Sequence, residues 1–281
     1  MAQIFSSTIC TLGEGPLWHP EEQVLYWFDI LGKRLYRSDG TTEQSWDFDE
    51  HVSAAGWVDT GVLLIASETS LSKFDTRTGE STFVHPLESD NPNTRSNDGR
   101  ADPWGGFWIG TMGKNAEPGA GAIYRYYDGT LTRLFDNITI SNAICFAPDG
   151  THAFYTDTQK RKILRVALGE DGFPAAKPDL FVDLSAEGLN PDGAVVDASG
   201  NLWVAQWGAS RVACYGPDGA SLRAVDVPAR QPSCPSFGGL DLSILYITSA
   251  TEGLDPAGEN DGMTFAAPSG ATGQKEHRVI L

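Results

Sequence analysis

Six short runs of apolar and aromatic residues recur along the chain at nearly regular intervals. Each run is a triplet preceded by a tight turn, and the six triplets are Leu25-Tyr26-Trp27, Leu63-Leu64-Ile65, Phe107-Trp108-Ile109, Phe154-Tyr155-Thr156, Leu202-Trp203-Val204 and Leu245-Tyr246-Ile247. The step between central residues runs from about 38 to about 48 residues, a period typical of the four-stranded blades of a β-propeller. We therefore expect each triplet to be the buried second strand of one blade.

The segments around the triplets also have the pattern of strands. Apolar and polar residues alternate in short runs, turn residues interrupt them roughly every 8–12 positions, and no long helical period is present. Turns such as Asp149-Gly150 favour hairpins, because Asp promotes turn initiation and Gly tolerates a positive φ. The runs Gly56-Trp57-Val58 and Ala194-Val195-Val196 are then first strands.

This pattern predicts an all-β fold. We expect residues 1–281 to form a single six-bladed β-propeller domain, with four-stranded antiparallel blades around a central channel. A ring that stayed open would expose sheet edges. The N-terminal run of residues 3–8 is therefore expected to pair into the last blade, together with Met263-Thr264-Phe265 and Arg278-Val279-Ile280.

Four polar residues share one phase of the repeat. They lie roughly 11 to 13 positions before a triplet, and they are Glu14, Asn97, Asn142 and Asp192. In a radially repeated fold equal phase means equal height and radius, so these side chains should gather at one end of the channel. The same phase in the other two blades falls near Ser53 and Cys234, which are weak ligands for a hard cation.

Two carboxylates and two amides form an oxygen-rich donor set. Such donors suit Ca²⁺, Mg²⁺ or Mn²⁺ and, less typically, Zn²⁺ or Fe²⁺. We therefore predict one divalent cation of open identity, with positions left for water or substrate. Taken singly, Asp192-Gly193 and Asn97-Asp98-Gly99 would be no more than turns, and their common phase is what favours a site. His19, in a first strand near Glu14, is expected to be structural.

Charge and composition exclude several classes of function. The net charge of −17 argues against nucleic acid and anionic membrane surfaces as partners. No apolar run is long enough for a membrane span and no secretion signal opens the chain, so we expect a cytoplasmic protein, with a monomer as the default. The four cysteines lack C-x-x-C spacing and are expected to be reduced. Nucleophile-elbow, H-E-x-x-H, Walker and dinucleotide motifs are absent.

Several of these segments together resemble a known family. The motifs, in chain order, are Gly13-Glu14-Gly15-Pro16-Leu17-Trp18, Arg95-Ser96-Asn97-Asp98-Gly99 leading to Gly110-Thr111-Met112, Ser141-Asn142, Tyr155-Thr156-Asp157-Thr158 and Pro191-Asp192-Gly193 followed by Asn201-Leu202-Trp203-Val204. In order and spacing they resemble the regucalcin/gluconolactonase family, from about residue 10 to the C-terminus.

The resemblance implies a six-bladed propeller with one divalent ion near the top of the channel. It implies that Glu14, Asn142 and Asp192 are the protein ligands of the ion. Asn97 is then expected close to the ion, where it helps to hold substrate. The same resemblance implies that Arg95 and Glu117 contact sugar hydroxyls. The match at Glu117 depends on the nearby segment Gly121-Ala122-Ile123-Tyr124.

The activity implied is hydrolysis of a sugar lactone, such as gluconolactone, xylonolactone or arabinolactone, to the aldonic acid. The ion would polarise the lactone carbonyl and stabilise the oxyanion, while Asp192 takes a proton from the attacking water. Direct attack by a hydroxide on the ion is an equally open variant.

Two other functions remain open from the sequence alone. One is a metal-dependent esterase or phosphotriesterase on the same scaffold. The other is a calcium-binding regulatory protein without turnover, although so few protein oxygens would leave several calcium positions to water. A propeller used only for protein recognition would leave the shared phase of the four polar residues unexplained.

Overall fold

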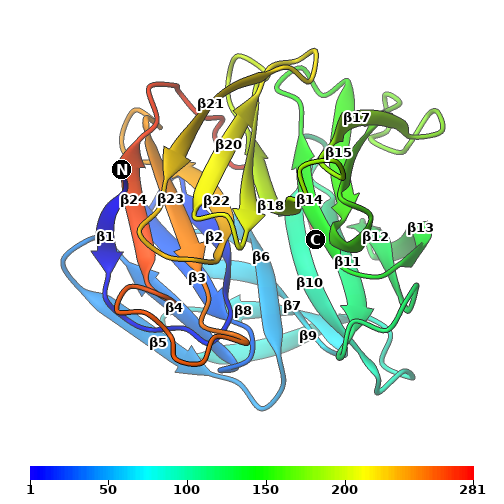
Figure 1. Ribbon diagram of the computed structural model, residues 1–281. Helices are drawn as coiled ribbons and strands as arrows, with labels where there is room; N and C mark the ends of the chain where they lie inside the picture. The colour runs from blue at the N-terminus through cyan, green and yellow to red at the C-terminus, as the bar shows by residue number, and fades with distance from the viewer.

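The computed structural model describes residues 1–281 and contains six four-stranded antiparallel sheets arranged as blades around a ring (Figure 1). The first five blades each use four consecutive strands. They are β2 (Gly13–His19), β3 (Val24–Asp29), β4 (Arg34–Ser38) and β5 (Glu43–Asp47); β6 (Val52–Asp59), β7 (Val62–Ser67), β8 (Ser70–Asp75) and β9 (Glu80–Pro86); β10 (Thr94–Ala101), β11 (Phe107–Gly113), β12 (Gly121–Tyr127) and β13 (Thr130–Ile138); β14 (Ser141–Phe146), β15 (His152–Asp157), β16 (Lys162–Ala167) and β17 (Asp179–Asp183); β18 (Asn190–Val196), β19 (Leu202–Trp207), β20 (Arg211–Tyr215) and β21 (Ser221–Asp226).

The predicted six-bladed propeller is therefore confirmed. Every apolar triplet lies in the second strand of its blade, in β3, β7, β11, β15 and β19 and in β23 (Ile244–Ser249) of the sixth blade. The helical structure consists of one 3-10 turn, η1 (Thr158–Lys160). Nothing in it approaches the length and apolarity that a membrane-crossing helix needs.

The core lies between the blades. The buried apolar residues form six clusters, and each cluster joins two neighbouring blades around the ring. Trp27, Trp108 and Trp203, one from each of three triplets, are fully buried. Burial of such a side chain contributes on the order of 3 kcal/mol, so the triplets hold adjacent blades together.

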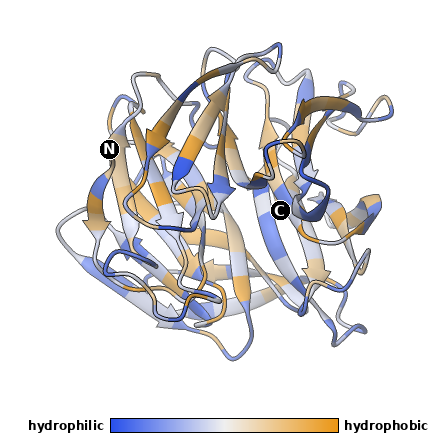
Figure 2. Ribbon diagram, in the orientation of Figure 1, coloured by the Kyte–Doolittle hydropathy of each residue, from blue (hydrophilic) through white to orange (hydrophobic).

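The outermost strands have the opposite character. In β5, β9 and β21 most residues are exposed, and Figure 2 shows hydrophilic colours concentrated in the loops and the hydrophobic colours within the strands. Charged residues in these strands limit pairing with other sheets, although Phe83 in β9 and Leu222 in β21 are exposed apolar side chains.

The sixth blade closes the ring by combining the first strand of the chain with its last three strands. It consists of β22 (Pro232–Gly238), β23, β24 (Thr264–Pro268) and β1 (Gln3–Ser6), in that order outward. Ile4 pairs with Phe265, and Figure 1 shows the blue β1 beside the red β24. The predicted closure by the N-terminal run is thus confirmed for β1, and Thr264 and Phe265 lie in the last blade as predicted.

The prediction that Arg278-Val279-Ile280 also belongs to the last blade is wrong. The backbone N–H of Val279 donates to the Trp57 carbonyl at 2.8 Å, and that of Ile280 donates to the Gly105 carbonyl at 2.8 Å. Val279 packs among residues of the second and third blades. Because β1 already occupies the outer position of the sixth blade, the C-terminal residues continue across the channel instead.

The C-terminal segment (residues 271–281) closes one end of the channel. Gln274 Nε2 donates to the carbonyls of Phe146 and Val196, at 3.1 and 2.9 Å. The Trp57 indole N–H donates to the Glu276 carbonyl at 2.9 Å. Phe146 and Val196 end the inner strands β14 and β18, and Trp57 lies near the end of β6, so the segment seals the end toward which the inner strands run.

Candidate active site at the channel mouth

The other end of the channel, where the inner strands begin, holds a cavity of about 660 Å³. Its wall includes Glu14 from β2, Asn97 from β10, Asn142 from β14 and Asp192 from β18. The structure therefore brings together the four residues that share one phase of the repeat. The remaining lining residues are Leu12, Leu31, Arg95, Met112, Lys114, Asn115, Ala116, Ile140, Thr158, Gln159, Arg161, Asn190, Trp207 and Glu252.

An irregularity in each inner strand aims these side chains at the channel. In β2 the pairing register slips between Glu14 and Leu17, where two residues face one on β3. Slips of the same kind occur in β10, β14, β18 and β22. Such bulges bend a strand and redirect side chains. The functional positions therefore arise from a backbone feature that is repeated from blade to blade.

Glu14 and Asn142 lie one position before the bulge, and the residue after each has a left-handed backbone. Gly15 has a φ of 54° and Ala143 a φ of 56°. Two features require glycine at position 15: the positive φ, and the Ser53 carbonyl, with which a Cβ would collide. Asn97 and Asp192 instead lie inside their bulges, which explains why the four residues match in phase only to within one or two positions.

Glu14 and Asp192 are buried carboxylates without a cationic partner. Each is 5% exposed, and neither takes part in an ion pair. Glu14 Oε2 accepts one hydrogen bond, from the Gly15 N–H at 3.0 Å. Burial, followed by the charge of Asp98, raises the pKa of Glu14. Burial, followed by the charge of Glu14, raises the pKa of Asp192 well above its usual range.

The amides beside them form an ordered network. Asn97 Nδ2 donates to the Ser141 carbonyl at 2.9 Å and to Asn142 Oδ1 at 3.1 Å. Asn97 Oδ1 accepts a hydrogen bond of 2.7 Å from Arg95 Nη1, which also donates to the Ser96 carbonyl at 2.9 Å. Burial lowers the pKa of Arg95, although nearby carboxylates oppose that shift. The network fixes both amides and the guanidinium before any substrate binds.

Asp98, next to Asn97, supports the wall from behind. Its Oδ2 accepts a 2.7 Å hydrogen bond from the N–H of Ile144, two residues after Asn142. Burial raises the pKa of Asp98 to about 6. Two neighbouring residues of the third blade, Asn97 and Asp98, thus both bind the bulge of the fourth blade.

The donor set fits a divalent cation. Glu14 and Asp192 are buried, and the charge of Glu14 raises the pKa of Asp192. Arg95 lies near enough to oppose the pKa shift of Glu14, but neither carboxylate forms an ion pair, and charge buried in this way costs several kcal/mol in a protein interior. A dication would compensate it, and Asn142 adds a neutral oxygen. No group of three or more His, Cys, Asp or Glu side chains is placed to hold a metal, so a cation here would use this mixed set of carboxylates and amides.

The two other residues predicted to bind substrate, Arg95 and Glu117, lie in different places. Arg95 lines the cavity. Glu117 does not: its carboxylate accepts hydrogen bonds from the backbone and side-chain N–H groups of Asn115, at 3.0 and 2.9 Å. Its role in substrate binding stays a prediction. Ser53 and Cys234, near the same phase in the other two blades, also lie outside the lining.

His19 lies far from the mouth. It ends β2, whereas Glu14 is at the start of that strand. Its Nδ1 accepts hydrogen bonds from the backbone N–H groups of Glu21 and Glu22, at 3.3 and 3.2 Å. These contacts hold the turn between β2 and β3, and they are structural, in agreement with the sequence-based expectation.

The sequence pattern missed a second set of wall residues. These residues end or follow the second strand of a blade: Leu31 after β3, Lys114 after β11, Arg161 after β15 and η1, Trp207 at the end of β19, and Glu252 after β23. These positions could have been predicted from the sequence, because a second strand runs antiparallel to the first and its end lies beside the start of the first strand.

Comparisons with known proteins agree with this architecture. Residues 12–251 match the model of the SMP-30/gluconolactonase/LRE-like region. A putative sugar lactone lactonase of Rhizobium meliloti (strain 1021) is 42% identical over 257 residues, which cover 90% of this chain and 86% of the relative. The L-arabinolactonase of Azospirillum brasilense is 40% identical over 260 residues, covering 90% of this chain and 85% of that protein.

A solved structure is similar along the whole length. The crystal structure of regucalcin from Agrobacterium tumefaciens, described as a calcium-binding protein, superposes with a TM-score of 0.97 at 39% identity, covering 100% of this chain and 98% of that one. The match of the family model to most of the chain, the identity to lactonases and the shared propeller all agree. The chain belongs to the SMP-30/gluconolactonase/LRE-like family.

Proposed function

We propose that the protein hydrolyses a sugar lactone to the aldonic acid and that the reaction depends on one divalent cation at the channel mouth. The observation that carries the proposal is the pair of buried carboxylates, Glu14 and Asp192, which open without a cationic partner into a cavity of about 660 Å³. The relatives named sugar lactone lactonase and L-arabinolactonase support the substrate class.

Glu14, Asn142 and Asp192 would hold the cation, with Asn97 beside it. When bound, the ion supplies Lewis acidity toward the lactone carbonyl oxygen, where negative charge develops in the transition state. The hydrogen bond from Asn97 to Asn142 keeps the amide of Asn142 in a fixed orientation.

Asp192 acts as the general base. Its carboxylate lines the cavity and forms no ion pair with Lys or Arg, so it is free to accept a proton from water. It accepts a proton from water as the water oxygen attacks the lactone carbonyl carbon. When the bond between that carbon and the ring oxygen breaks, the carboxyl of Asp192 returns the proton to the ring oxygen. The products are the open-chain acid and an enzyme in its starting protonation state.

Arg95 and Asn97 position the substrate. The guanidinium of Arg95 is held through Nη1 by the Ser96 carbonyl and by Asn97 Oδ1. Its other N–H groups remain for substrate oxygens, in the planar arrangement that distinguishes arginine from lysine. Positioning of this kind supplies much of the rate enhancement of a hydrolase.

The wall favours a polyhydroxylated substrate over an aryl ester or a phosphotriester. Of the 18 lining residues only six are hydrophobic, whereas pockets for drug-like apolar ligands are lined mostly by apolar side chains. A sugar lactone presents hydroxyl groups that can satisfy the polar wall residues as water is displaced.

The test is a panel of pentono- and hexonolactones, with phenyl acetate and paraoxon as non-sugar substrates. Acid release is measured with chelated protein and after addition of Ca²⁺, Mn²⁺, Zn²⁺, Mg²⁺ or Fe²⁺. We expect metal-stimulated hydrolysis of at least one lactone. Turnover of the aryl ester or phosphotriester alone would contradict the substrate class, and calcium binding without turnover of any compound would contradict the enzymatic proposal.

A further inference from the structure

Three basic residues line the cavity, and they differ in how their charge is used. Arg95 is deeply buried beside the proposed catalytic groups. Lys114 Nζ donates to Glu68 Oε2 at 2.7 Å, so a carboxylate already neutralises it. Arg161 is half-buried at the rim and forms no ion pair. Its charge remains available to a ligand.

The side chain of Arg161 is anchored by one edge only. Its Nε donates to Asn190 Oδ1 at 3.0 Å, whereas neither Nη atom has a protein partner. The backbone is held as well, because the Arg161 N–H donates to the Thr158 carbonyl at 3.1 Å and the Arg161 carbonyl accepts from Leu184 at 2.9 Å. The guanidinium is thus oriented before ligand binding, which lowers the entropy cost of binding.

The anchor also sets where Arg161 lies relative to the chemistry. Asn190 begins β18, two residues before Asp192 on the same strand. Asp192 is buried on the channel side of that strand, whereas Arg161 is at the rim. A substrate whose carbonyl reaches Asp192 would therefore extend its remote end toward Arg161.

The charge of the wall contrasts with that of the whole protein. Three acidic and three basic residues line the cavity, although the chain carries a net charge of −17. Because Glu68 already pairs with Lys114, Arg161 is the cation at the rim that no carboxylate pairs. Carboxylate, sulfonate and phosphate groups bind arginine through paired charge-assisted hydrogen bonds.

We propose that Arg161 is a specificity-determining residue that binds an anionic group at the end of the lactone remote from its carbonyl. The protein then prefers lactones with a terminal carboxylate, sulfonate or phosphate over neutral analogues. This assignment rests on the proposed lactone hydrolysis, which it extends from sugar lactones in general to their acidic members.

The experiment compares two lactones that differ at one carbon. Glucaro-1,4-lactone carries a carboxylate where glucono-1,4-lactone carries a hydroxymethyl group. For the unaltered protein we expect kcat/KM to be higher for the anionic lactone by about tenfold or more, and Arg161→Gln should lower that ratio by about tenfold, as for loss of a charge-assisted pair. Arg161→Lys, which keeps charge without the planar donor pair, should give an intermediate ratio.

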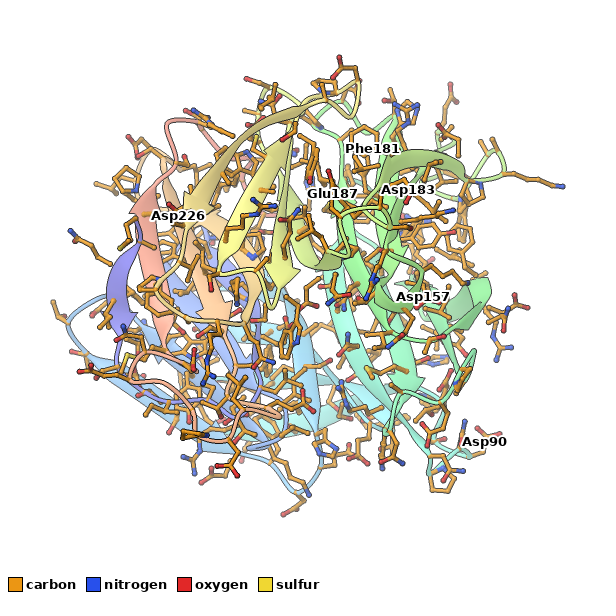
Figure 3. All side chains as sticks on the ribbon, viewed as in Figure 1. Asp90, Asp157, Phe181, Asp183, Glu187 and Asp226 are labelled. Carbon is orange, nitrogen blue, oxygen red and sulfur yellow. The ribbon has the colours of Figure 1, made fainter.

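Lys160→Gln is the matched control. Lys160 belongs to the same turn, but it does not line the cavity, and its Nζ lies 3.3 Å from Asp157 Oδ2 (Asp157 is labelled in Figure 3). This variant should keep the wild-type ratio. If Arg161→Gln reduced kcat/KM equally for both lactones, or left both unchanged, the preference for anionic substrates would be overturned while lactone hydrolysis stood.

A binding measurement separates this proposal from the proposed function. If the protein hydrolysed neither lactone nor any other in the panel, the proposed function would fail. Calorimetric titration with glucarate and gluconate would still decide the role of Arg161. Tighter binding of glucarate that is lost in Arg161→Gln supports it, and equal Kd values for the two anions contradict it.

Discussion

Buried carboxylates are paired with a cation at one end of the channel and unpaired at the other. At the sealed end Glu276 of the C-terminal segment pairs with Arg100, and both side chains are at most 10% exposed. At the mouth Glu14 and Asp192 are buried as deeply, with no such partner. In a buried ion pair the two charges compensate each other, whereas unpaired buried carboxylates destabilise the protein unless a ligand compensates their charge. The comparison indicates that the sealed end stabilises the fold, and it agrees with the proposal that the mouth binds a cation and substrate.

The largest expected effect concerns the mouth. Asp192→Asn should lower kcat/KM for the preferred lactone by about 10³-fold or more, because the proposed base and one cation ligand are lost together. Thermal stability should stay the same or rise, since a buried carboxylate is removed. Steady-state kinetics and calorimetry on one preparation measure both. Wild-type turnover would remove Asp192 from the mechanism.

Removal of divalent cations should lower the activity at the channel mouth and leave the fold of the ring intact. We expect chelated protein to lose about 10²-fold or more of its activity while its far-ultraviolet circular dichroism stays unchanged, because packing between blades maintains the fold. Tm should fall by a few degrees, as for loss of a ligand that binds only the native state. Activity should return when metal is added back. Unfolding on chelation would show that the ion is structural.

The sealed end should respond in the opposite sense. Glu276→Gln removes the carboxylate that pairs with the buried guanidinium of Arg100, so the free energy of unfolding should fall by about 3 kcal/mol. The folded fraction should retain kcat/KM within about threefold, because the pair lies away from the cavity wall. Glu259→Gln, at an exposed position, is the control. A larger loss of kcat/KM than of stability would contradict the division between the two ends.

Asn97 tests the hydrogen-bond network that joins Arg95 to Asn142. Asn97→Ala removes the hydrogen bonds to Ser141 and Asn142 and the acceptor for Arg95. We expect kcat/KM to fall by about tenfold, with a rise in KM, as typical for loss of a positioning side chain. The measurement is a full saturation curve, and Asn93→Ala, at an exposed position outside the cavity wall, is the control. An unchanged KM would assign Asn97 a purely structural role.

The smallest expected effect is on pH dependence at the sealed end. Burial lowers the pKa of His277, so the unfolded chain binds a proton more readily than the folded one. The stability from neutral His277 is complete above the unfolded pKa of about 6.5 and declines as pH falls toward the folded value. In His277→Asn the loss of stability between pH 7 and 5 should be smaller by a few tenths of a kcal/mol. An identical pH profile in denaturant titrations would contradict this.

The repeat explains why so much could be predicted from sequence. Each blade places its residues by the same local rules, so the phase of Glu14, Asn97, Asn142 and Asp192 predicted their convergence without knowledge of any contact. The apolar triplets predicted the second strands for the same reason. Features that break the repeat were the ones that sequence reasoning misplaced.

The C-terminal segment is the main example of such a break. Val279 is a β-branched residue typical of strands, and we expected it in the sixth blade. Because β1 already occupies the outer edge of that blade, the Val279 N–H donates instead to the Trp57 carbonyl. Arg161 and Glu252 follow the repeat, because both come from the ends of second strands, which antiparallel pairing places beside the starts of the first strands. Which of these side chains enter the wall depends on contacts between residues far apart in sequence.

The sequence by itself determined the number of blades, the identity of the buried strands and the polar residues that converge at one end of the channel. These follow from periodicity, which is a local property of the chain. Only the tertiary structure decided which end is sealed, which charges are paired and which side chains complete the wall, because pairing and burial depend on groups far apart in sequence, such as Arg100 and Glu276.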